Sequence, residues 1–170
     1  KRFYENARAV FCQSSFHENI IYRNLHIENI VNLSGNLWSL NDLNIMRGFL
    51  KKDKNESFSI LDSPIQHKNT SEAVHYCKLK GFDFNLVSSN NYKLFLSLLS
   101  NNSKFIFLPK TPETLSRVTV EARMMGLKVI TNKNVGATYE PWFSLKGEKL
   151  IYEMFSKREM IVKKVLEFIK

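Results

Sequence analysis

The sequence predicts an α/β protein built on a doubly wound, Rossmann-like parallel sheet. Short apolar runs alternate along the chain with longer segments of helical periodicity, and turn-forming residues separate most of them. Strands that alternate with helices normally form a parallel sheet that is covered on both faces. A chain of 170 residues with 44% hydrophobic residues can bury one sizeable core. We therefore expect residues 1–170 to form one domain.

The beginning of the chain predicts two strands with a helix between them. Ala9–Cys12 is a short apolar run, and Ser15–Asn24 follows with helical periodicity and with Ser14 or Ser15 as its N-cap. Asn29–Leu33 has the composition of a second strand. A Ser-Gly-Asn cluster at 34–36 ends it in a turn.

The next segment predicts a helix, a strand and a second helix. Asp42–Lys51 has a weak helical pattern, and a charged loop extends from there to Glu56. Phe58–Leu61 is an apolar strand that ends at the turn 62–64. Asn69 and Glu72 have the spacing of a capping box, so a helix is expected to start there and to end at Gly81.

Two further segments and the end of the chain continue the alternation. Phe82–Val87 alternates between apolar and polar residues, as a strand does, and Asn91–Ser100 has leucines and a phenylalanine on one helical side. Gly147–Lys170 is helical by pattern, with a break expected near Ser156.

The stretch from Phe105 to Glu140 carries the strongest functional signal. Phe105–Leu108 predicts a buried strand that is closed by Pro109, and Glu113 follows in the next loop. A helical pattern containing Glu121 ends at Gly126, and Leu127–Ile130 predicts another buried strand. Ligands bind parallel sheets at the carboxyl ends of the strands, where Glu113 is expected to lie.

The spacing of these carboxylates favours an extended ligand. If Thr114–Val120 is helical, eight residues bring Glu121 to within about 80° of Glu113 around the helix and about 12 Å along it. That distance is too long for the carboxylate pair of a glycoside hydrolase. The expected helix N-terminus at 114–117 suits a phosphate, and Arg117 adds donors that fit a diphosphate. These features together describe a site for a nucleotide sugar.

Each acidic residue also has a structural interpretation. Glu113 is a first-turn acid that a helix dipole stabilises, and Glu121 lies on an otherwise apolar segment and needs a polar partner. Glu140, after the predicted strand and loop, either binds the ligand or caps a turn. These alternatives remain open on spacing alone.

Composition limits the class of partner. The formal net charge of +9 and the sequence pI of about 9.6 favour anionic partners, without choosing among nucleotides, nucleic acid and acidic lipid. The two cysteines fit no metal or redox spacing and predict reduced thiols in a cytoplasmic protein. No apolar segment is long enough to span a bilayer. Because the chain begins at Lys1 rather than Met, we expect it to be part of a longer protein.

The motif resembles the carboxyl-terminal domain of GT-B-type glycosyltransferases, in particular the large retaining group (group one, or family four) related to sucrose synthases and to bacterial lipopolysaccharide and capsule transferases. That group carries Glu, seven residues and a second Glu, followed here by Ala122 and Gly126. Pro109 and the 136–140 loop also match, and Lys68 falls at the position of a basic residue that contacts the donor diphosphate. The same resemblance implies that residues 1–28 include the crossover from a missing amino-terminal domain and that 29–36 open the second domain.

The resemblance implies roles for individual residues. Glu113 contacts the donor sugar at the reaction centre and is the candidate catalytic residue, whereas Glu121 binds the nucleotide ribose. Lys68 and Arg117 hold the diphosphate together with Thr114, Leu115 and Ser116. Gly136 and Glu140 are secondary candidates. The family's Arg is replaced here by Ser63, and the Gly after Lys68 is replaced by Asn69.

The implied function is transfer of a sugar from a nucleoside diphosphate sugar to an acceptor hydroxyl with retained configuration, in polysaccharide biosynthesis. The resemblance implies no metal and no other cofactor, and the chain has no Asp-x-Asp motif or histidine cluster. Two alternatives stay open: a non-catalytic domain that binds nucleotide or polyanion, and a sugar-nucleotide epimerase. No nucleic-acid motif is visible.

The carboxyl-terminal helix predicts a further contact. Basic residues alternate with apolar ones, a pattern that fits either a helix packed on the domain with a solvated basic face or an amphipathic helix at an anionic inner-membrane surface. The basic residues concerned are Lys157, Arg158, Lys163 and Lys164.

Overall fold

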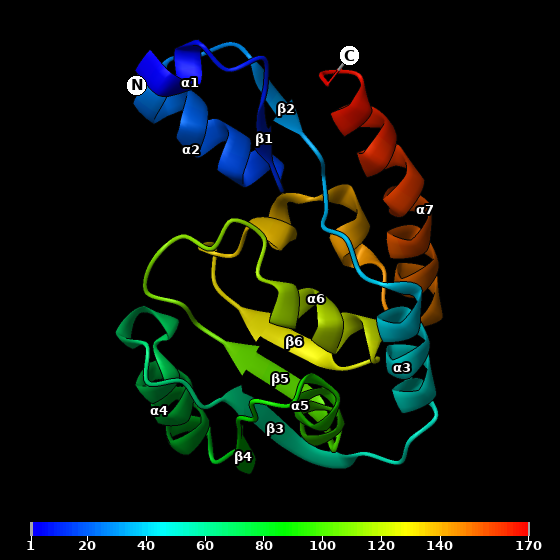
Figure 1. The fold of residues 1–170 in the computed structure, drawn as a ribbon. Helices are drawn as coiled ribbons and strands as arrows, with labels where there is room; N and C mark the ends of the chain where they lie inside the picture. The colour runs from blue at the N-terminus through cyan, green and yellow to red at the C-terminus, as the bar shows by residue number, and fades with distance from the viewer. Residues whose placement is uncertain (1, 170) are drawn as a thin grey trace.

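The computed structural model describes residues 2–169 and has the predicted α/β class. All pairs of adjacent strands run parallel (Figure 1). The strands divide between two sheets: a two-stranded sheet, β1–β2, and a four-stranded sheet in the order β4–β3–β5–β6. The strands are β1 (Val10–Cys12), β2 (Ile30–Asn32), β3 (Asn55–Leu61), β4 (Phe84–Val87), β5 (Asn102–Phe107) and β6 (Lys128–Thr131).

Helices connect the strands, as the alternating pattern predicts. The α-helices are α1 (Arg2–Glu5), α2 (Ser15–Leu25), α3 (Leu40–Leu50), α4 (Thr70–Lys80), α5 (Tyr92–Leu99), α6 (Arg117–Met124) and α7 (Glu148–Leu166). Three short 3-10 turns are η1 (Gln66–Lys68), η2 (Gly136–Tyr139) and η3 (Pro141–Ser144).

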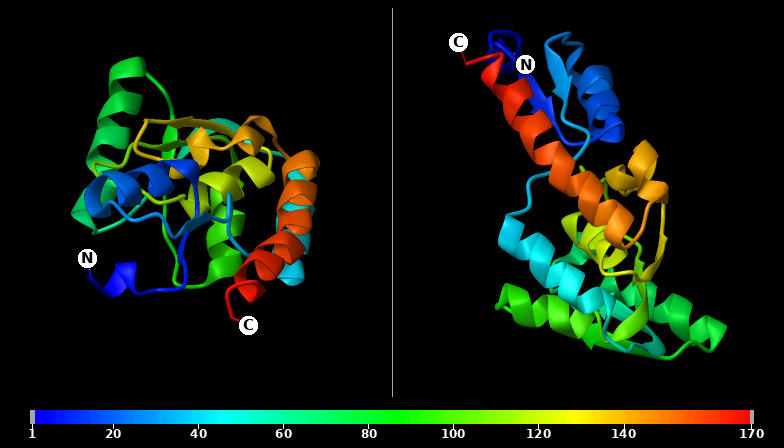
Figure 2. Two further views of the ribbon diagram at one scale, coloured as in Figure 1. Left: turned by 90° about the horizontal axis from the view of Figure 1, so that it is seen from above. Right: turned by 90° about the vertical axis from the view of Figure 1, so that its right-hand side faces the viewer.

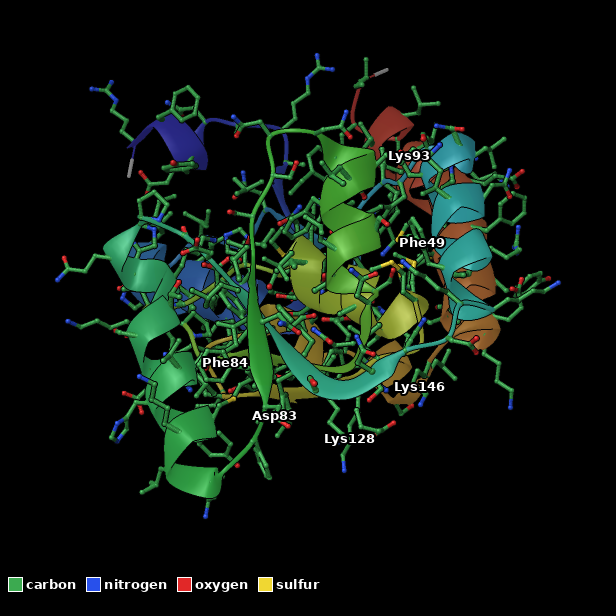
Figure 3. All side chains as sticks on the ribbon, turned by 90° about the horizontal axis from the view of Figure 1, so that it is seen from below. Phe49, Asp83, Phe84, Lys93, Lys128 and Lys146 are labelled. Carbon is green, nitrogen blue, oxygen red and sulfur yellow. The ribbon has the colours of Figure 1, made fainter. Side chains whose placement is uncertain are left out.

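The four-stranded sheet is covered on both faces because its central strands alternate between two buried clusters. In β5, Phe105 and Phe107 belong to the larger cluster and Ile106 to the smaller one. Helix α4 covers the smaller cluster through Ala73 and Cys77, and α5, α6, α3 and α7 cover the larger one. Figure 3 shows α4 and α5 on opposite sides of β3 and β4. This arrangement explains why the strand is apolar at successive positions.

The small sheet lies beside the main one rather than within it. Val10 pairs with Ile30 and Phe11 with Val31, so β2 joins β1. The strand predicted at 29–33 is therefore present as β2, and it pairs with β1 rather than with a strand of the four-stranded sheet. Strands pair with segments that are distant in the sequence, and an apolar run alone does not show which other strand it will pair with.

The termini of several helices differ from the prediction. The capping box at Asn69 is absent: this residue has a left-handed conformation, with φ of 60°, and its Nδ2 donates to the Leu108 carbonyl. A capping box exists instead at Ser39 and Asp42, before α3. Gly81 ends α4 as predicted, with φ of 64°. Strand β3 begins at Asn55, inside the segment expected to be a loop.

Helix α7 is continuous through Ser156, so the expected break is wrong. The Ser156 hydroxyl donates to the Glu153 carbonyl within the helix. In Figure 2, α7 extends from the four-stranded part of the molecule to the small sheet. Its basic residues are only partly solvated. Lys157 is buried, with its Nζ 3.4 Å from Glu153 Oε1, and Lys164 Nζ donates to the Asn32 carbonyl at 2.8 Å.

Candidate functional site

The candidate site lies at the carboxyl ends of β3, β5 and β6. The loop after β5 carries Glu113 and is fixed to the loop after β6 by backbone hydrogen bonds. The Glu113 N–H donates to the Asn134 carbonyl at 2.7 Å, and the Gly136 N–H donates to the Glu113 carbonyl at 2.9 Å. Glu113 and Val135 form a parallel bridge. The backbone of Glu113 is therefore held in place by strand-like pairing.

The side chain of Glu113 forms an ion pair with Lys68. The distance from Lys68 Nζ to Glu113 Oε1 is 2.8 Å, and the side chains are 26% and 16% exposed. Lys68 ends η1, which follows β3, and its ammonium lies 5.9 Å from the centre of the Phe107 ring. The His67 carbonyl accepts from the Lys110 N–H, which ties η1 to the β5 loop. The structure thus brings together the two residues that the sequence placed at this edge.

Ser63, where the resemblance places an Arg, forms a turn. Ser63 follows β3, its N–H donates to Thr70 Oγ1 and its hydroxyl accepts from the Ile65 N–H. Its short side chain closes the turn before η1 and supplies no charge.

Helix α6 begins later than the sequence predicted. Its first residue is Arg117, and Ser116 before it has a left-handed backbone with φ of 69°. Glu113 and Glu121 therefore do not share one helix, which overturns the geometry expected from a helical segment at 114–120. Leu115 is buried, and the Ser116 hydroxyl bonds the Thr119 hydroxyl at 2.8 Å.

The N-terminus of α6 has free backbone donors. The N–H groups of residues 115–118 donate to no other atom of residues 2–169. Four consecutive donors at a helix start form a site of partial positive charge. This end of α6 therefore suits an anion, as expected from the sequence, although the first helical residue is Arg117 rather than Thr114.

Glu121 is buried with three hydrogen-bond donors around one oxygen. It is 3% exposed, and its Oε1 accepts from Trp38 Nε1 at 3.0 Å, from the Tyr92 hydroxyl at 2.9 Å and from Arg117 Nε at 3.4 Å. Burial and the nearby carboxylate raise the pKa of Tyr92, which keeps its hydroxyl protonated as a donor. Among the described residues, none donates to Oε2.

Arg117 points toward Glu121 rather than toward Lys68. Its Nη1 donates to the Leu37 carbonyl at 3.1 Å, and its guanidinium lies 4.9 Å from the centre of the Trp38 ring. The structure therefore has two ion pairs, Lys68 with Glu113 and Arg117 with Glu121. Because Arg117 turns toward Glu121 and Trp38, the expectation that Lys68 and Arg117 face one open crevice is not supported. Among the concave regions on the described residues, five of about 430 to 570 Å³ are lined by other residues.

Thr114 and Gly136 belong to the contact between the two sheets. Ser14 Oγ donates to the Thr114 carbonyl at 2.5 Å, and Thr114 Oγ1 donates to Gln13 Oε1 at 2.8 Å. A Cβ at Gly136 would lie 2.2 Å from the Thr114 carbonyl oxygen. Glycine is therefore required here for close backbone approach.

Glu140 caps a helix. It is buried, and its carboxylate accepts from the Ser15 N–H at 2.6 Å and from the Ser34 hydroxyl. The Trp142 indole N–H also donates to the Ser34 carbonyl. These contacts agree with the capping interpretation of Glu140, although the cap is on α2 rather than on its own turn.

The aromatic partners of Glu121 were not predicted from the sequence. Trp38 lies in the link before α3, and Tyr92 opens α5; both have a polar atom at the tip of an apolar ring. A buried carboxylate needs such donors, but the sequence does not show which aromatic residues supply them.

Comparisons with protein-family models, with curated proteins and with solved structures found no match for this chain. No helix within residues 2–169 is long and apolar enough to cross a membrane. The same residues contain no group of three or more His, Cys, Asp or Glu side chains placed to hold a metal ion. Both cysteines, Cys12 and Cys77, are buried free thiols.

Proposed function

We propose that this chain is the donor-binding domain of a retaining glycosyltransferase that uses a nucleoside diphosphate sugar. The observation that carries the proposal is the pair Glu113 and Glu121 on either side of the α6 N-terminus, with Lys68 beside Glu113. Sugar and ribose hydroxyls donate hydrogen bonds to carboxylates, and a diphosphate needs N–H donors and a cation between them. The resemblance assigns the sugar to Glu113 and the ribose to Glu121.

In the proposed reaction the bond between the anomeric carbon and the diphosphate oxygen breaks, the acceptor oxygen bonds that carbon, and the hydroxyl proton passes to the leaving diphosphate. Negative charge develops on the leaving phosphate, and Lys68 and the N–H groups at 115–118 stabilise it. Glu113 positions the sugar at the reaction centre. Arg117 contributes by holding Glu121 rather than by reaching the phosphate. The acceptor site belongs to an amino-terminal domain, and the enzyme acts in the cytoplasm in polysaccharide biosynthesis.

The direct test is a thermal-shift screen against UDP-, GDP-, ADP- and CMP-sugars. A ligand present at a hundred times its dissociation constant stabilises the folded state by about 2.7 kcal/mol, a readily measured shift. Lys68→Ala should weaken nucleoside diphosphate about tenfold to a hundredfold, since a charge-assisted bond is worth about 1.5–3 kcal/mol. Binding of the nucleoside alone should be unaffected. If no nucleotide sugar stabilises the protein, the proposal fails.

A second candidate is a non-catalytic nucleotide- or polyanion-binding domain. This candidate is favoured because both carboxylates already have partners within the protein. Glu113 is paired with Lys68, and buried Glu121 accepts three hydrogen bonds. The two candidates differ in their preference for the sugar. A donor-binding domain binds the nucleotide sugar and loses that affinity in Glu113→Gln, whereas a polyanion binder prefers pyrophosphate and is indifferent to the sugar.

A further inference from the structure

Helix α7 exposes an apolar stripe along its outer side. Tyr152, Phe155, Val162 and Leu166 are 68%, 48%, 47% and 49% exposed, and Ile169 continues the stripe in the turn after the helix. The right-hand view of Figure 2 shows α7 crossing the face of the molecule that is nearest the viewer. Large side chains gathered on one helix face normally mark an interaction surface.

The stripe has the spacing of a coiled-coil seam. Together with Glu159, its residues recur at alternating intervals of three and four, which keeps them on one side of a helix that packs against another helix. Tyr152, Glu159 and Leu166 take one seam position, and Phe155, Val162 and Ile169 take the other. The side that packs on the domain uses different residues, including Leu150, Met154 and Ile161. The seam is therefore additional to the packing that holds α7 in place.

A concave region lies on the same stripe. It has a volume of about 570 Å³ and is lined by residues of α7 alone, among them Tyr152, Phe155, Glu159 and Val162. A gap between the side chains of one helix can accept the side chains of a partner helix, as in knobs-into-holes packing.

We propose that α7 pairs with the α7 helix of a second copy of this chain in an antiparallel two-helix seam. In this register Tyr152 faces Ile169 of the other copy and Phe155 faces Leu166, so each aromatic ring meets an aliphatic side chain. Glu159 faces Val162. A two-fold axis relates the two helices, so each of these contacts occurs twice in the interface, as in other symmetric homodimers.

Charge selects the antiparallel arrangement. A parallel pair would place Glu159 directly against Glu159 of the other copy, an arrangement of like charges that is unfavourable. In the antiparallel pair the two Glu159 carboxylates lie in successive layers, about 4.5 Å apart along the seam, rather than directly opposite each other. Lys163 of the other copy lies close to each one. On the flanks Arg158 faces Val165 and Lys163 faces Ser156, so no like charges oppose each other. The same carboxylate disfavours an anionic lipid surface as the occupant.

The oligomeric state tests the proposal directly. Analytical ultracentrifugation between about 1 and 100 μM should show a reversible dimer, because the seam is shorter than a standard interface. Val162→Lys should abolish the dimer, and Leu79→Lys should not, since Leu79 is an exposed leucine at the end of α4. Glu159→Leu, a change at an exposed position, should tighten the dimer at least severalfold. Monomer throughout this range, in wild type and in Glu159→Leu, overturns the proposal.

Cysteine cross-linking tests the register. Phe155→Cys and Leu166→Cys are made separately, and Cys12 and Cys77 are buried and do not interfere. When the two proteins are mixed under mild oxidation, a disulfide between them should form faster than either variant forms a disulfide with itself. Faster pairing of Phe155→Cys with itself indicates a parallel seam and overturns the proposal. A monomer that sediments with anionic vesicles overturns it in favour of a lipid surface.

Discussion

Two ion pairs bracket the N-terminus of α6, and each occupies a carboxylate that a ligand is proposed to use. Lys68 lies 2.8 Å from Glu113, and Arg117 lies 3.4 Å from Glu121. The two pairs differ in burial, because the Glu113 side chain is 16% exposed and that of Glu121 only 4%. A phosphate that arrives at Lys68 therefore competes with Glu113.

This competition leads to a prediction with an unexpected sign. Glu113→Gln should tighten the binding of nucleoside diphosphate by up to about fivefold, since a partly exposed pair is worth up to about 1 kcal/mol. The same variant should weaken the binding of the sugar-carrying donor. Calorimetric titration measures both. Glu56→Gln, which breaks the ion pair with Lys104, is the matched control and should change neither. Weaker binding of both ligands would rule out the competition.

Gly136 and Gly48 form a matched pair for stability. A Cβ at Gly136 would clash with the Thr114 carbonyl oxygen, whereas a Cβ at Gly48, inside α3, meets nothing within 4 Å. Gly136→Ala should destabilise the protein by several kcal/mol or prevent folding, and Gly48→Ala should stabilise it by about 0.5–1 kcal/mol. Urea denaturation measures both values. A tolerated alanine at 136 would contradict the close approach of the two loops.

His17 makes stability depend on pH. Burial lowers its pKa below the ordinary value of 6.5, and its Nδ1 has no hydrogen-bond partner among the described residues. The unfolded state therefore binds this proton more readily than the folded state. Its contribution to stability is complete above pH 6.5 and is lost as the pH falls through the folded pKa. Melting temperatures measured from pH 7.5 to 5 should fall in the wild type and fall less in His17→Gln. Equal slopes would contradict this role for His17.

Individual elements were predicted well where they depend on burial and poorly where they depend on single backbone angles. The strands β3, β5 and β6 follow from apolar runs, and α4 ends at Gly81 as expected because glycine adopts the left-handed cap without strain. The start of α4 at Asn69 was predicted, but the capping box does not form because Asn69 has a left-handed backbone. Helix α6 begins later than expected because Ser116 also has left-handed angles, which the sequence does not predict. Lys68 and Glu113 were expected at one site from the resemblance, and they form an ion pair. Trp38 and Tyr92, which donate to Glu121 from distant segments, were not predicted.

The start of α6 allows a test at the scale of the element. Ser116 has a positive φ and precedes the free N–H groups at 117 and 118. Ser116→Gly should preserve this conformation and leave nucleotide affinity close to wild type, at a cost of about 0.5–1.5 kcal/mol for the lost hydroxyl bond to Thr119, which Ser116→Val also loses. Ser116→Val should be destabilising by about 1–2 kcal/mol more than this, since a branched side chain is strained there. Chemical denaturation and nucleotide titration compare the two variants. Equal changes in the free energy of unfolding for the two variants would show that the positive φ of Ser116 does not affect stability.

At the scale of the whole molecule, the class of fold was predictable and the division into two sheets was not. The alternation of strands and helices requires a parallel α/β arrangement, but it contains no information about which strands are neighbours. The link at 33–39, the 136–144 segment and α7 all connect the two sheets. Glu140 and Lys157 both contact Ser34 in this region, so the connection is polar as well as apolar.

The end of α7 holds the small sheet in place, and this has a consequence for local opening. The rings of Phe11 and Phe168 pack edge to face, with their centres 5.8 Å apart, and Lys164 Nζ donates to the Asn32 carbonyl. A two-stranded sheet is marginal by itself. Fraying of the last turn of α7 should therefore release the amides of β1 and β2 to solvent deuterium while those of β5 stay protected. Loss of the contacts made by Lys164 and Phe168 should therefore open the smaller sheet and leave the larger one folded.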